Sequence, residues 1–140
     1  MKRRVTICSL IVAALFASAC PTTQQRLLDS DVDQLKIRSI QTRSFDTGDR
    51  PQVLRATVAT LQDLGFVVDK ADSDLGTVTA TKLAGYKARA TVTVRQKSDK
   101  LSVVRISIEH NEKTVENPEI YQDFFSALSK SLFLSANQVD

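Results

Sequence analysis

The sequence predicts an α+β fold, a two-layer domain in which two helices cover one face of an antiparallel sheet of about five strands. Apolar and polar residues alternate through 86–96 and 101–110, as in strands with one buried and one wet face. Two other segments, 50–64 and 118–136, carry apolar residues at helical spacing after clear start signals. The predicted element order is β-α-β-β-β-β-α.

The first strand is predicted over residues 35–45, which are rich in β-branched side chains. Leu35 and Ile37 fall on one face of such a strand and Ile40 falls on the other, so we expect a bulge or a late start. The four later strands are expected at residues 66–71, 77–83, 86–96 and 101–110, with turns at 72–76 and 97–100.

The first helix is expected from residue 50 to residue 64. Asp49 is a suitable N-cap, Pro51 lies in the first turn, and Gln52 stands at the capping-box position. Gly65 suits the left-handed conformation that often ends a helix. The predicted buried stripe consists of Leu54, Thr57, Val58 and Leu61.

The second helix begins after Asn117, a good cap, with Pro118 at its first position and Glu119 favouring the helix dipole. Its length suits a helix that crosses a whole domain. One apolar stripe is predicted to face the sheet, formed by Tyr121, Phe124, Phe125, Leu128 and Leu132.

The first 19 residues have the pattern of an export signal peptide. Lys2, Arg3 and Arg4 precede an uncharged, mostly aliphatic run over residues 5–16, and small residues follow at 17–19. The apolar run is shorter than the roughly 20 residues of a permanent membrane span. We therefore expect residues 1–19 to be removed.

The next residue is a cysteine, and Ala17-Ser18-Ala19-Cys20 resembles the lipobox of bacterial lipoproteins, with Ala17 where Leu is commonest. The resemblance implies cleavage before Cys20, a diacylglycerol on its sulfur and acylation, for example with palmitate, of the new amino group. Several acyl chains anchor a protein stably to a membrane. The predicted location is the periplasmic side of a membrane. In the lipoproteins that this segment resembles, Asp after the cysteine favours retention in the inner membrane, so the resemblance implies that Pro21 at this position favours the outer membrane. Residues 20–34 then form a lipidated linker, and residues 35–140 form one domain.

Removal of the signal changes the charge and the thiol content. Of the 19 Lys and Arg residues three leave, so 16 remain against 16 Asp and Glu. Nucleic-acid binding thereby loses its electrostatic basis. Cys8 leaves as well and Cys20 is consumed by lipid, which excludes disulfides, thiol catalysis and cysteine metal sites.

Two acidic patterns are weak candidates for cation binding. Asp29, Asp31 and Asp33 alternate as in a calcium loop, but the sixth position is Gln34 instead of Gly and the twelfth is Ile40 instead of Glu. We interpret the stretch as a solvated linker.

His110 is the single histidine, with Glu109 and Glu112 nearby. Zinc sites need three or four ligands, so His110 is predicted to be a solvated residue at a strand end. The sequence predicts no cofactor, no metal site and no catalytic residue, and thus a protein that is not an enzyme.

The strand at 86–96 carries the best candidate for a binding surface. Lys87, Arg89 and Arg95 share its polar side with Thr91 and Thr93. A merely solvated sheet face explains this pattern. The alternative hypothesis is a docking surface for an envelope protein, because a bare sheet face with exposed edges can recruit a partner.

The stretch QTRSFDTGDRPQVLRATVATLQDLGFVVDKADSDLGTVTATK, residues 41–82, resembles small Gram-negative envelope lipoproteins, some of them associated with multidrug efflux. More distantly, the element order is similar to that of BamC-like helix-grip domains of the β-barrel assembly machine. The resemblance implies a non-catalytic accessory or scaffold subunit of an envelope complex. A small-molecule or lipid-binding helix-grip module remains the alternative, in which Tyr121, Phe124 and Phe125 line a cavity. A filled core beneath the last helix would favour the accessory subunit.

Overall fold

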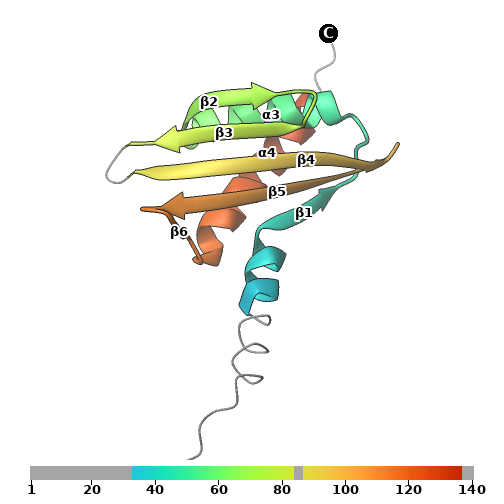
Figure 1. Cartoon of the computed structure of the whole chain (residues 1–140). Coiled ribbons are helices and arrows are strands. Elements are labelled where there is room, and N and C mark those ends of the chain that lie inside the picture. Colours follow the sequence, from blue (N-terminus) through green and yellow to red (C-terminus); the bar gives the residue numbers. More distant parts are fainter. Residues whose placement is uncertain (1–32, 84–86, 137–140) are drawn as a thin grey trace, which may run out of the picture. The chain divides into compact units, whose positions relative to one another are not determined.

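The computed structural model describes residues 33–83 and 87–136 (Figure 1). Contacts divide the chain into two units, Met1–Gln34 and Leu35–Asp140. The predicted signal peptide, Cys20, Asp29 and Asp31 lie outside the described residues. The second unit has the predicted α+β fold, with helices packed against an antiparallel sheet. Among the described helices, none is both long and apolar enough to span a membrane.

The sheet has six strands in the order β1-β5-β4-β3-β2, and β6 is added to β5 beside β1. All pairs are antiparallel. The predictions missed β6, since two residues are too few for a visible alternation. The elements in chain order are β1 (Thr42–Phe45), α3 (Arg50–Asp63), β2 (Val67–Asp72), β3 (Thr77–Lys82), β4 (Ala88–Ser98), β5 (Leu101–His110), β6 (Lys113–Thr114) and α4 (Pro118–Ala136).

The prediction of a strand from residue 35 is wrong for its first half. Residues 33–40 are helical, and only Thr42–Phe45 pair with β5. Gln41 joins the two parts: its N–H donates to Ile37 O (3.1 Å) and its carbonyl accepts from Ile106 N (2.9 Å). Strand propensity is a weak preference, and a segment without a neighbouring strand to pair with can become helical despite it. The change of face at Ile40 was the sign in the sequence that a regular strand does not extend through residues 35–40.

The start of α3 follows the predicted capping pattern. Asp49 is the N-cap, and its Oδ1 accepts a hydrogen bond from the Gln52 N–H at 2.8 Å. Pro51 occupies the first turn, where its missing N–H costs nothing. Asp49 thereby satisfies one of the donors that every helix start leaves unpaired.

The end of α3 is a Schellman motif at the predicted glycine. Gly65 has φ +81°, and its N–H donates to Gln62 O at 2.9 Å. The Phe66 N–H donates to Leu61 O, also at 2.9 Å. Lys82 of β3 donates from Nζ to Leu64 O at 2.8 Å, so the helix end is fastened to the sheet.

The buried face of α3 is wider than the predicted stripe. Val58 is only half-buried, whereas Val53, Ala56 and Thr60 are buried although they were not predicted. This helix packs against both the sheet and α4, so side chains on two of its sides are buried instead of on one. The buried Thr57 hydroxyl donates to Val53 O at 2.8 Å, which satisfies it inside the helix.

The core lies between the inner face of the sheet and the two long helices, which Figure 1 shows behind the strands. Every residue of the predicted α4 stripe is buried, and Tyr121, Phe125 and Leu128 have no exposed surface. The inward residues of the two central strands complete it: Ala88, Ala90, Val92 and Val94 of β4, and Val104, Ile106 and Ile108 of β5.

The turn between β2 and β3 is held from two sides. Arg50 of α3 donates from Nη2 to the carbonyls of Ser73 and Asp74, the latter at 2.7 Å. Gly76 has φ +70°, and a Cβ there would lie 2.4 Å from Val94 O. Only glycine therefore allows the turn to approach β4 this closely.

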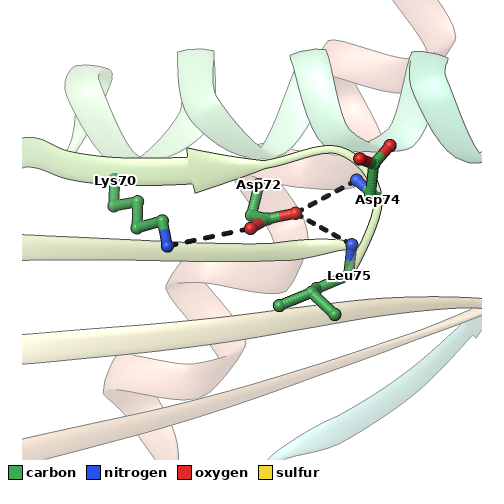
Figure 2. A network of polar contacts seen from close by, with 4 residues as sticks. All are labelled: Lys70, Asp72, Asp74 and Leu75. Carbon is green, nitrogen blue, oxygen red and sulfur yellow. Dashed lines mark hydrogen bonds and ion pairs between the residues drawn. The ribbon is translucent and has the colours of Figure 1, made fainter.

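Asp72 organises the inside of the same turn (Figure 2). Its Oδ1 accepts from the backbone N–H groups of Asp74 (3.1 Å) and Leu75 (2.9 Å), and Oδ2 lies 3.7 Å from Lys70 Nζ. These contacts, the Leu75 hydrogen bond first, lower the pKa of Asp72 below its ordinary value of 3.8.

We expect Phe125→Ala to lower the free energy of unfolding by about 3–5 kcal/mol, because it removes a fully buried ring from a filled core. Phe133 on the same helix is 67% exposed, so Phe133→Ala should change stability by only about 0.5 kcal/mol. Chemical denaturation of both variants measures the contrast. Equal losses would show that the ring of Phe125 is not a core element.

We expect Asp72→Asn to destabilise the protein at neutral pH but not in acid. A carboxylate with a lowered folded-state pKa stabilises fully above the unfolded value of 3.8, and the contribution is lost as pH falls through the folded pKa. The stability difference between wild type and variant should therefore shrink with decreasing pH. Denaturant titrations across that range measure it, and a constant difference would contradict the role assigned to the charge.

Candidate functional site

No described helix covers the outer face of the sheet (Figure 1). In Figure 1 α3 and α4 lie behind the strands, and the front of β3, β4 and β5 is open. Along β4 the predicted alternation is confirmed from Ala88 to Arg95, with buried residues at even positions and more exposed ones at odd positions. Tyr86, the first residue of the predicted alternation over 86–96, lies outside the described residues.

Strand register arranges the outward residues in rows across the sheet. Thr79 of β3, Thr91 of β4 and Ser107 of β5 form one row. The next row contains Thr77, Thr93, Arg105 and Thr42. The outer surface of these strands therefore consists mainly of hydroxyl-bearing side chains, with arginine side chains between them.

Lys87 and Arg89, two of the predicted binding residues, lie together at one end of β4. They line a hollow of about 370 Å³ with Glu109, Asn111 and Glu112. Arg89 stands directly opposite Glu109. Opposite charges in such a cross-strand pair contribute about 0.2–1 kcal/mol, so this end of the face is partly neutralised.

The hairpin from β5 to β6 borders this hollow and has unusual backbone angles. Asn111 and Glu112 have φ of 47° and 64°, in the left-handed region that a two-residue hairpin turn requires. Glutamate is uncommon there, and such strained residues often occur at functional sites. The turn holds the Glu112 backbone at the rim of the hollow that contains Lys87.

His110 is half-buried at the end of β5 and is less solvated than predicted. Its Nδ1 lies 3.2 Å from Lys87 O, and its Nε2 lies 3.1 Å from Asn111 Nδ2. The ring thus ties the end of β4 to the turn. Within residues 33–83 and 87–136, no group of three or more His, Cys, Asp or Glu side chains could hold a metal ion.

Arg95, the third predicted residue, lies near the other end of β4. It lies six positions beyond Arg89, a distance of about 20 Å along a strand. Its neighbour is Arg105 of β5, with which it lines a second hollow of about 460 Å³. The structure therefore divides the predicted set between two places.

Sequence reasoning missed Arg105 as a site residue. The inward positions Val104 and Ile106 already imply that Arg105 points outward. Its proximity to Arg95, however, depends on the β4–β5 register, which a single sequence does not reveal.

Beneath α4 there is little space for a ligand. Tyr121, Phe124 and Phe125 are buried, and the rings of Phe124 and Phe125 stack edge-on with centroids 5.2 Å apart. A hollow of about 180 Å³ lies beside them, lined among others by Phe66, Val115 and Ile120. Small-molecule sites usually enclose about 300–1,000 Å³, so the aromatic stripe is core and not the wall of such a site.

A shallow apolar groove of about 400 Å³ lies between α3 and β2. Leu54, Val58, Ala71 and Val78 contribute apolar lining, and the charged residues Arg55 and Asp72 also line the groove. Comparison of the chain with protein-family models and with curated proteins gives no match.

Proposed function

We propose that the protein is a lipid-anchored lipoprotein on the periplasmic side of the outer membrane, where it serves as a non-catalytic accessory or scaffold subunit of an envelope complex. Its partner docks on the outer face of the sheet. The observation that supports this most is a sheet face that no described helix covers. Its central strands carry Arg89, Arg95 and Arg105 against Glu109, and Lys87 directly precedes β4.

Charge explains how such a face selects a partner. The predicted mature chain has no net charge, so a local excess of cations is a feature of this face and not of the whole protein. Exposed charges contribute little to folding, typically about 0–1 kcal/mol per pair. They do steer association with an acidic surface, which makes docking faster at low salt and sensitive to ionic strength.

The filled core favours an accessory subunit over a ligand-binding module. A module of that kind would hold its ligand between the last helix and the sheet, where Tyr121 and Phe125 have no exposed surface. These aromatic side chains pack in the core and therefore cannot form the wall of a ligand cavity. What the domain offers to other molecules is its outer surface.

Lipidation of Cys20 is the first part of the proposal to test. When cells are fed a clickable fatty acid, the label should appear on the wild-type protein. It should also appear on the Cys8→Ala variant, because Cys8 lies in the predicted signal peptide. The Cys20→Ala variant should lose the label. Equal labelling of Cys20→Ala and wild type would remove the anchor from the proposal.

Docking is tested by the double variant Lys87→Glu and Arg89→Glu. We expect an unchanged melting temperature and loss of the protein that co-purifies with wild type from detergent-solubilised membranes, because reversed charges repel an acidic partner. The matched control reverses Arg55 of α3 and Lys130 of α4, which are exposed on other surfaces and give the same change in net charge. Full retention of the partner by the Lys87/Arg89 variant would mean that this face is only solvated.

A further inference from the structure

The second hollow on the sheet face, about 460 Å³ in volume, differs from the first in its charge. Its described lining residues include two arginines, Arg95 and Arg105, and no carboxylate. On β5 the next outward acid is Glu109, four residues from Arg105 and therefore about 14 Å along the strand. The remaining lining residues are Thr42, Thr91, Thr93, Val103 and Ser107.

The β4–β5 register places the two arginines as diagonal neighbours. Arg105 is opposite Thr93, and Arg95, two residues further along β4, is opposite Val103. Diagonal positions on one sheet face are about 7–8 Å apart, within reach of two long side chains. The fold thus holds two like charges at a spacing that an anion between them would relieve.

Both guanidinium groups are available for a ligand. Within the part of the chain that the structure describes, neither the Arg95 nor the Arg105 guanidinium forms an ion pair or a hydrogen bond. Each guanidinium carries five N–H donors in a planar fork that matches phosphate and carboxylate oxygens.

Hydroxyl groups supply further donors from the floor of the hollow. They come from three neighbouring strands: Thr42 of β1, Thr91 and Thr93 of β4, and Ser107 of β5. One arginine fork already satisfies the two oxygens of a planar carboxylate. Donors that approach from both sides and from below suit the oxygens of a tetrahedral dianion better.

We infer that this hollow binds the phosphate group of a small phosphorylated molecule. The volume exceeds what a phosphate alone fills and lies in the range of small-molecule sites, so an organic group accompanies the phosphate. The inference adds a ligand site at the Arg95 end of the proposed docking face, and it can be tested separately, because Arg95 lies about 20 Å along β4 from Arg89, one of the two residues that the docking test reverses.

The test uses the full chain in detergent and inorganic phosphate as the probe, followed by calorimetry and by ³¹P NMR at fixed ionic strength. Arg95→Gln and Arg105→Gln should each weaken phosphate binding about tenfold or more, the usual effect of losing a hydrogen bond to a charged group. Arg105→Lys should lie between wild type and Arg105→Gln, because it keeps the charge and loses the fork. Melting temperatures verify that the variants fold.

The matched control is Arg89→Gln, on the same strand and the same face, which should change phosphate affinity by less than about twofold at physiological salt. The Lys87→Glu, Arg89→Glu variant should likewise retain phosphate binding even where it loses a protein partner, so the two proposals fail separately. Three results would overturn the inference: no saturable phosphate binding, an equal loss in Arg89→Gln, or tighter binding of succinate than of phosphate.

Discussion

The ring of Phe125 is the contact on which the two layers of the domain depend. It is fully buried, packs edge-on against Phe124 in its own helix, and lies 6.4 Å from the ring of Phe45 on the edge strand β1. The guanidinium of Arg43 lies 5.1 Å above the same ring and covers it at the margin of the sheet. One side chain therefore joins α4, the inner face of the sheet and the short strand that ends the sheet. With α4 fixed there, the apolar residues at alternate positions of β4 and β5 are buried against it, and the opposite face is mostly polar, with Val103 as an apolar exception.

Local sequence predicted those elements that local chemistry determines. The ends of α3 were predictable because a capping aspartate and a glycine in the left-handed region act within a few residues. The alternation in β4 and β5 was predictable because each strand is buried on one face only. All five predicted stripe residues of α4 are buried, because this helix also packs on the core along one side only.

Non-local contacts determine the parts that were mispredicted. Residues 35–40 are apolar enough for a strand, but β5 pairs with this segment only from Gln41 onward. The side chain of Gln41 is 98% buried and lies 3.4 Å from the hydroxyl of Tyr121, which in turn donates to Val115 O. A helix that changes to a strand at one buried polar residue depends on partners 65 to 80 positions away, which no local pattern contains.

The candidate site shows the same division. Alternation correctly assigned Lys87, Arg89 and Arg95 to the outer face, and it contained enough information to assign Arg105 as well. Strand register determines which cations become neighbours. It places Lys87 and Arg89 near Glu109, and it places Arg95 beside Arg105, which was not predicted. The positive φ of Glu112 could not be predicted from the sequence either, because Asn-Gly is the usual sequence of such a hairpin turn and this turn has Asn-Glu.

The edges of the sheet indicate why a partner would use its face. The free edge at β2 has an irregular register between Val68 and Lys70, and Lys70 is 73% exposed. Bulges and lysines at an edge are the usual means by which proteins prevent another strand from adding to a sheet. The opposite edge consists of two short strands, β1 and β6, of four and two residues. Both edges are thus poor templates for strand addition, whereas the face between them is open, rich in hydroxyl groups and cationic. Recognition by this domain is therefore expected to proceed through side chains on the face, and to respond to salt and charge reversal instead of to backbone pairing at an edge.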